Sequence, residues 1–156
     1  IGSNLGDPEL QVERAIEALR MLTDAATLVV SERYRSLPWG DPDQDPYINA
    51  VAAFDTVLTP QQLLDELLAI ERRHGRERSS DRRYGPRTLD LDLLLYADAV
   101  IDEPGLRLPH PHLHERAFVL LPLADIAPDL VIPGHGAVKT LLKPDFASLC
   151  WRLGQH

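Results

Sequence analysis

Apolar residues recur at helical spacing in two segments of the chain. Between Pro8 and about Leu22 they predict one face of a helix, formed by Leu10, Val12, Ala15, Ile16, Leu19 and Leu22. Asp7 is a suitable N-cap for this helix, because Pro8 would then take its first position. A second helix is predicted to start at Pro60 after a Thr59 cap and to end before Gly75, with its apolar stripe at Leu63, Leu64, Leu67, Leu68 and Ile70.

Strand-like segments flank these helices. Residues 27–35 and 47–58 are predicted as two strands, joined by a loop over 36–46 that holds three Pro, one Gly and three Asp. Residues 89–96 read as a further strand, and residues 1–7 as the end of a strand and a turn. A short hairpin is predicted around the Glu103-Pro104-Gly105 turn.

The order strand, helix, strand, strand, helix, strand predicts an α+β fold. It matches a ferredoxin-like βαββαβ core, in which an antiparallel sheet carries both helices on one face. A C-terminal extension of short helices is expected at 115–120, at 122–126 and after His135. The length of 156 residues suits a single domain over 1–156. Because the chain opens at Ile1 without a Met, we expect its first strand to be truncated at the N-terminus.

Composition narrows the functional classes. The chain is 44% hydrophobic and 26% charged, which excludes a disordered chain. A net charge of −8 argues against binding nucleic acid or a membrane surface, and the apolar runs are too short to span a bilayer. The single Cys150 excludes an intramolecular disulfide and favours a reducing, cytoplasmic location.

The charge is reversed in one segment. Residues 71–87 contain seven Arg, three acidic residues and no Lys. A solvated loop is the simplest interpretation, but guanidinium groups offer planar, bidentate donors to phosphate oxygens. The segment therefore favours a site for a multiply charged anion.

Two aspartates follow this arginine-rich segment. Asp90 and Asp92 are two residues apart on a predicted strand, so both carboxylates face one side while Leu89, Leu91 and Leu93 face the other. An exposed strand edge would explain them, but a paired set of carboxylates next to a phosphate site also suits Mg²⁺. Neither the P-loop motif nor the GxGxxG fingerprint is present.

Several motifs together carry a resemblance to a known family. The sequence GPRTLDLD at 85–92 resembles the signature of the 6-hydroxymethyl-7,8-dihydropterin pyrophosphokinase family. Five other segments match the same family in order and spacing, namely 1–7, 47–51, 70–71, 108–111 and 115–120. The resemblance implies an enzyme of folate biosynthesis that transfers pyrophosphate from ATP to the hydroxymethyl group of the pterin and releases AMP. A monomer is the default expectation.

The resemblance also implies roles for individual residues. Asp90 and Asp92 would hold two Mg²⁺ ions, and with Arg76 and Arg87 they would form the catalytic set. ATP would contact Glu71, Arg76, Arg78, Arg83, Tyr84, Arg87, His110 and Arg116. Tyr84 stands where some members carry Trp. Glu71 could instead be a partner within its helix at i,i+4 spacing.

The pterin would be held by stacking and amide pairing. Tyr47 and Phe118 match two aromatic residues that sandwich the ring in the family, although either alone could be a core aromatic. Asn49 offers both a donor and an acceptor on the same strand face as Tyr47. The rest of the expected pocket comes from the loop residues Ser36, Leu37, Pro38 and Trp39.

Other functions stay open from the residues alone. A ferredoxin-like sheet can also present aromatics to nucleic-acid bases, though the net charge opposes this. A metal-dependent phosphohydrolase could use the same two aspartates. His110, His112 and His114 alternate as in a zinc site, but Pro109 and Pro111 make a regular strand there improbable, which favours solvated loop histidines for His112 and His114.

Overall fold

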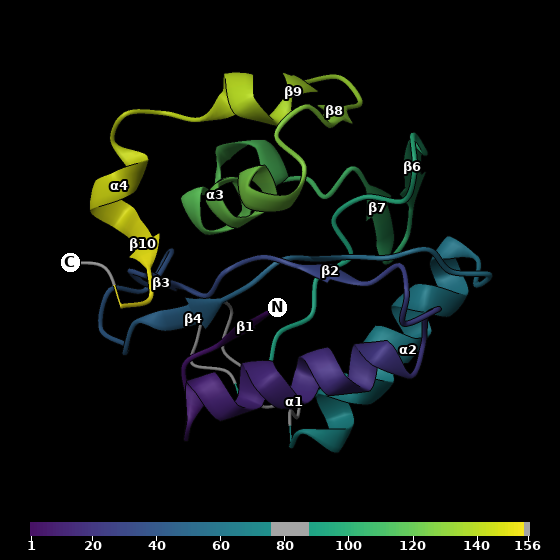
Figure 1. Ribbon diagram of the computed structural model, residues 1–156, viewed down its shortest axis with the longest axis horizontal. Helices are drawn as coiled ribbons and strands as arrows, with labels where there is room; N and C mark the ends of the chain where they lie inside the picture. The colour runs from purple at the N-terminus through teal and green to yellow at the C-terminus, as the bar shows by residue number, and fades with distance from the viewer. Residues whose placement is uncertain (76–87, 155–156) are drawn as a thin grey trace.

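The computed structural model describes residues 1–75 and 88–154. The two amphipathic helices lie where the sequence predicts them (Figure 1). In α1 (Pro8–Arg20) the Asp7 carboxylate accepts a hydrogen bond from Leu10 N at 3.1 Å. In α2 (Pro60–Arg73) Thr59 and Gln62 form a reciprocal capping box. Five residues of the expected ATP site lie outside the described residues, namely Arg76, Arg78, Arg83, Tyr84 and Arg87.

The central sheet has four antiparallel strands in the order β1-β4-β3-β10. These are β1 (Gly2–Ser3), β4 (Tyr47–Asn49), β3 (Tyr34–Ser36) and β10 (Cys150–Arg152). Gly2 pairs with Asn49, and Cys150 pairs with Ser36. The C-terminal strand β10 was not expected, because only tertiary pairing with β3 distinguishes this short segment from a loop.

The two predicted strands after α1 are each interrupted. Residues 27–35 form β2 (Val29–Val30) and β3, while residues 47–58 form β4 and β5 (Ala52–Ala53). The Ser31 side chain explains the interruption, because its hydroxyl accepts the Val51 N–H at 2.9 Å while Ser31 N donates to Val51 O. The Ser31 hydroxyl thus takes the place of a backbone carbonyl as acceptor between the two strands. Beyond this point, β2 pairs with β5 in a separate two-stranded sheet.

The segment 88–96 is not a regular strand. Asp90 alone forms a bridge to Gly2, with both backbone hydrogen bonds at 2.8 and 2.9 Å. The predicted alternation nevertheless holds, since Leu89 and Leu91 are buried at 0% and 3% exposure against the helices. The structure therefore confirms an α+β fold with antiparallel sheets.

The part of the chain that contains α3 (Ala117–Ile126) covers the face of the central sheet opposite to α1 and α2. The predicted hairpin is present as β6 (Ile101–Glu103) and β7 (Leu106–Leu108). The two short helices expected at 115–120 and 122–126 are one continuous helix, α3 (Ala117–Ile126), after a 3-10 turn η1 (Leu113–Glu115). The remaining elements are β8 (Val131–Ile132), β9 (Gly136–Ala137), η2 (Val138–Leu141) and α4 (Phe146–Leu149).

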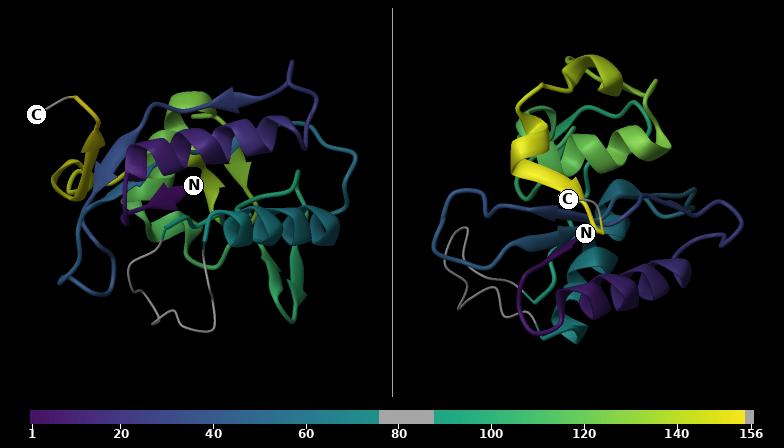
Figure 2. Two further views of the ribbon diagram at one scale, coloured as in Figure 1. Left: turned by 90° about the horizontal axis from the view of Figure 1, so that it is seen from below. Right: turned by 60° about the vertical axis from the view of Figure 1, so that its left-hand side comes forward.

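Helix α3 contains Pro122, and its apolar residues pack into one core cluster with Tyr34 and Val51. Figure 2 shows α3 and α1 on opposite sides of the sheet. Helices α1 and α2, the two helices that the prediction places on one face, pack together on the side of the sheet away from α3 (Figure 2). Among the described residues, no helix has the length and apolar character that crossing a membrane requires.

Candidate active site

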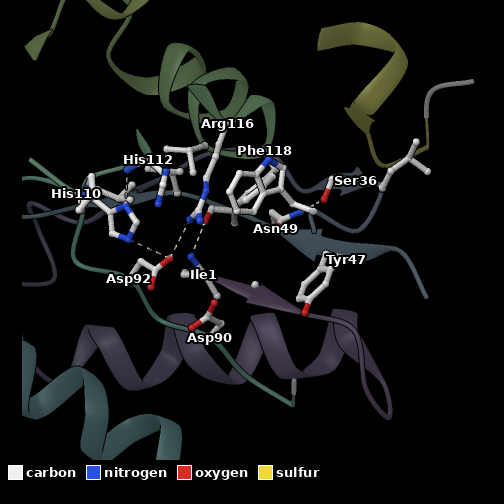
Figure 3. Close-up of a pocket in the computed structure, with 18 residues that line it drawn as sticks. Ile1, Ser36, Tyr47, Asn49, Asp90, Asp92, His110, His112, Arg116 and Phe118 are labelled. Carbon is white, nitrogen blue, oxygen red and sulfur yellow. Dashed lines mark hydrogen bonds and ion pairs between the residues drawn. The ribbon is translucent and has the colours of Figure 1, made fainter. Parts of the chain in front are cut away.

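Residues predicted from separate motifs meet in one cavity of about 390 Å³ (Figure 3). It lies between the sheet, the 90–94 segment, the turn before η1 and the start of α3. The expected site residues that line it are Ser36, Leu37, Trp39, Tyr47, Asn49, Asp90, Asp92, His110, Arg116 and Phe118. The loop residue Pro38 is not among the lining residues in the described part of the chain.

The two carboxylates line this cavity together, on the face opposite Leu89 and Leu91. Burial and the nearby Asp90 carboxylate raise the pKa of Asp92 above its ordinary value. Like-charge repulsion of this kind is relieved by a cation. The donor set of paired carboxylates in a cavity therefore fits a divalent metal ion such as Mg²⁺.

Two basic side chains approach Asp92 from the other wall. His110 Nε2 lies 3.9 Å and Arg116 Nη1 4.0 Å from Asp92 Oδ2. The Nδ1 atom of His110 accepts the backbone N–H of His112 at 3.2 Å, so the neutral ring carries its proton on Nε2. Burial lowers the pKa of His110 below its ordinary value. His110 therefore presents an N–H donor to the space beside Asp92.

The opposite end of the cavity carries amide and aromatic groups. Asn49 and Ser36 are both buried, and Asn49 Nδ2 donates to Ser36 Oγ at 2.8 Å. A Cβ atom on Gly2 would stand 3.1 Å from Asn49 Oδ1, so glycine allows the close approach of β1 to this amide. Tyr47 and Phe118 line the same end (Figure 3). This end suits a flat ligand with hydrogen-bonding edges.

Glu71 lies outside this cavity. Its side chain is 1% exposed and accepts the backbone N–H of Leu91 at 3.2 Å. Leu91 is the residue between the two aspartates, so Glu71 holds the backbone that carries them. Through this hydrogen bond Glu71 connects α2 to a distant segment of the chain.

The three alternating histidines do not converge. His112 lines the cavity and bonds Glu115 Oε1 at 2.5 Å, which lowers the pKa of Glu115. His114 instead stacks on His135 with ring centroids 4.0 Å apart. Within residues 1–75 and 88–154, no group of three His, Cys, Asp or Glu side chains is placed to hold a metal ion.

His112 is a cavity residue that the sequence did not reveal. Its motif predicted a solvated loop histidine, and its place in the cavity depends on the η1 turn and on Trp39, whose ring centroid lies 5.5 Å away. The contact joins two segments more than seventy positions apart in the sequence, so no local pattern could have indicated it.

A second hollow of about 830 Å³ adjoins Asp92. Leu64 and Leu68 of α2, with the β6–β7 hairpin, form much of its wall, and it shares Asp92, His110 and Pro111 with the first cavity. Asp92 thus stands at the boundary between two spaces large enough for separate ligands.

Comparison with known proteins gives one consistent result. A sequence model described as 7,8-dihydro-6-hydroxymethylpterin-pyrophosphokinase matches residues 1–128. The chain is 50% identical over 142 residues to a protein of Pseudomonas aeruginosa PAO1, covering 91% of this chain and 86% of that protein. It is 47% identical over 145 residues to one of Methylorubrum extorquens, covering 93% and 90%. Both relatives are named 2-amino-4-hydroxy-6-hydroxymethyldihydropteridine pyrophosphokinase.

Proposed function

The chain belongs to the 7,8-dihydro-6-hydroxymethylpterin-pyrophosphokinase family, and we propose that it transfers pyrophosphate from ATP to the hydroxymethyl group of 6-hydroxymethyl-7,8-dihydropterin, giving the pterin diphosphate and AMP in folate biosynthesis. One observation carries the proposal. The Asp92 carboxylate stands where the amide and aromatic pocket, which Asp90 also lines, adjoins a second hollow, so two substrates can meet beside it.

The pterin takes the end of the cavity lined by Asn49, Tyr47 and Phe118. The Asn49 amide and the Ser36 hydroxyl supply buried hydrogen-bonding groups, and the aromatic rings supply flat apolar surface. Leu37, Pro38 and Trp39 of the β3–β4 loop complete this pocket in the proposal. The hydroxymethyl group then points toward the carboxylates.

ATP takes the second hollow, with its polyphosphate reaching Asp92. Asp90 and Asp92 would hold two Mg²⁺ ions, whose positive charge would offset the negative charge of the phosphates. The Nε2–H of His110 and the Arg116 guanidinium donate to phosphate oxygens from the opposite wall. Glu71 supports the site through the Leu91 backbone.

The arginine-rich segment completes the ATP site in this proposal. Arg76 and Arg87 contact the triphosphate and, with the two aspartates, form the catalytic set. Arg78, Arg83 and Tyr84 close over the nucleotide, which excludes water and strengthens the charged contacts.

The proposal also includes the domain organisation, the oligomeric state and the cellular location. The chain is a single domain over 1–156 that acts as a cytoplasmic monomer. The Gly2–Asp90 bridge puts the segment that carries the aspartates beside β1, which supports the ferredoxin-like order of strands.

The test is an incubation of the protein with ATP, Mg²⁺ and 6-hydroxymethyl-7,8-dihydropterin, following AMP. We expect AMP to form only when all three are present, and Asp92→Ala to abolish it while pterin still binds. Release of phosphate or pyrophosphate without the pterin would instead indicate a phosphohydrolase. Undiminished AMP formation by Asp92→Ala would contradict the metal assignment.

A further inference from the structure

The indole of Trp39 packs directly on the Arg116 guanidinium. The guanidinium carbon lies 4.5 Å from the centroid of the Trp39 ring and 5.5 Å from that of Phe118. The Trp39 ring also neighbours His112, with ring centroids 5.5 Å apart. Figure 3 shows Arg116, Phe118 and His112 gathered on the wall of the cavity that faces the carboxylates. Trp39 therefore connects the β3–β4 loop to the segment before α3.

These contacts constrain a long and otherwise variable side chain. The Arg116 side chain is only 11% exposed and ends with Nη1 4.0 Å from Asp92 Oδ2. A guanidinium over the face of an indole is attracted by the ring quadrupole, and more strongly where water is excluded. An arginine fixed in this way before the substrate arrives does not lose its rotamer freedom during the reaction.

We propose that Trp39 is a positioning residue, whose ring holds the Arg116 guanidinium beside Asp92, where charge must be neutralised during transfer. The inference rests on the proposed function. It gives Trp39 a role on the phosphate side of the cavity, beyond lining the pterin pocket. The two roles predict different kinetics, because a positioning residue changes kcat whereas a lining residue changes the affinity for the pterin.

A double-mutant cycle separates these roles. We expect Trp39→Leu to lower kcat about tenfold and to change the Kd of the pterin less than about twofold. Trp39→Phe should restore most of the rate, because a ring face remains for the guanidinium. In an Arg116→Ala background, Trp39→Leu should not lower kcat further, since its effect on kcat acts through Arg116.

Two results would overturn the inference. If the losses from Trp39→Leu and Arg116→Ala multiply, Trp39 acts independently of Arg116. If Trp39→Leu and Trp39→Phe weaken pterin binding but leave kcat unchanged, Trp39 only lines the pocket. Trp151→Phe, in β10 and outside the cavity lining, is the matched control for loss of a tryptophan and should leave kcat unchanged.

A measurement without substrates separates failure of this inference from failure of the proposed function. The chain has two tryptophans, so Trp151→Phe leaves Trp39 as the sole indole. In that background, Arg116→Ala should shift the Trp39 emission and increase its quenching by acrylamide. Unchanged emission and quenching would exclude the contact even if the protein forms AMP. A shift caused by Arg116→Ala, in a protein that forms no AMP, would support the contact and reject the proposed function.

Discussion

Replacing Glu71 with Ala tests whether this buried carboxylate supports the aspartate segment or contacts ATP. Glu71 is 1% exposed at the end of α2 and accepts the Leu91 N–H at 3.2 Å. Leu91 is itself 3% exposed, so water cannot replace the lost acceptor. We therefore expect Glu71→Ala to destabilise the ligand-free protein, in which no nucleotide contact exists.

The size of the effect follows from two contributions. Leaving a buried N–H without an acceptor costs about 1–3 kcal/mol, and the lost side chain removes about 0.8 kcal/mol for its buried methylene. The sum is about 2–4 kcal/mol. In a protein of this size each kcal/mol lowers Tm by about 2–4 °C, so Tm should fall by about 4–16 °C. Glu71→Gln keeps an acceptor oxygen and should cost less than about 1 kcal/mol.

Thermal unfolding followed by circular dichroism, without nucleotide or metal, measures this shift. Glu66→Ala on the same helix is the matched control and should change stability by less than about 0.5 kcal/mol. A Tm of Glu71→Ala within about 2 °C of the unmodified protein, together with a lost affinity for ATP, would refute the supporting role and indicate a direct nucleotide contact.

Three further predictions concern the pterin pocket, the core and the carboxylates. Asn49→Ala should weaken pterin binding more than nucleotide binding in calorimetry, and the reverse order would exclude this pocket. Burial raises the pKa of the Cys150 thiol to about 12, so Ellman's reagent at pH 8 should modify this thiol only after the protein unfolds. The neutral thiol contributes stability below its unfolded pKa of ~8.5, and this contribution is lost as the pH rises toward the pKa of the folded state. Burial and Asp90 raise the pKa of Asp92, so the affinity for Mn²⁺ should begin to fall with decreasing pH at a pH still above the pKa of ~3.9 of an ordinary aspartate. A Mn²⁺ affinity that stays unchanged down to that pH would contradict the assignment.

The sequence predicts the acidic face of the cavity, because that face depends on a local pattern. The period-two alternation of Leu89, Asp90, Leu91 and Asp92 separates apolar and acidic faces before any tertiary structure is known. The structure buries the leucines and exposes the aspartates to the cavity as expected. The helix caps at Asp7 and Thr59 are predictable for the same reason, since a cap is a contact across three residues.

Contacts between distant segments are what the sequence could not supply. The alternation at 89–92 does not require a regular strand, and only the Gly2 bridge shows how little ladder is formed. The packing of Trp39 on Arg116 depends on where a loop with three prolines meets the start of α3. The pairing of β10 with β3 is likewise tertiary. Each of these was missed because its energy comes from burial and geometry rather than from propensity.

The segment that carries the carboxylates is fixed by other elements instead of by a strand ladder. Asp90 exchanges both backbone hydrogen bonds with Gly2 of β1, Leu91 donates to Glu71 of α2, and Leu94 O accepts from His110 N at 2.9 Å. These anchors come from three parts of the chain and hold residues 90–94. A catalytic constellation needs its groups held by such supporting contacts. Because the last anchor is His110 itself, the backbone that carries the two carboxylates is joined directly to the donor that faces them, and a change at Glu71 or Gly2 should disturb both together.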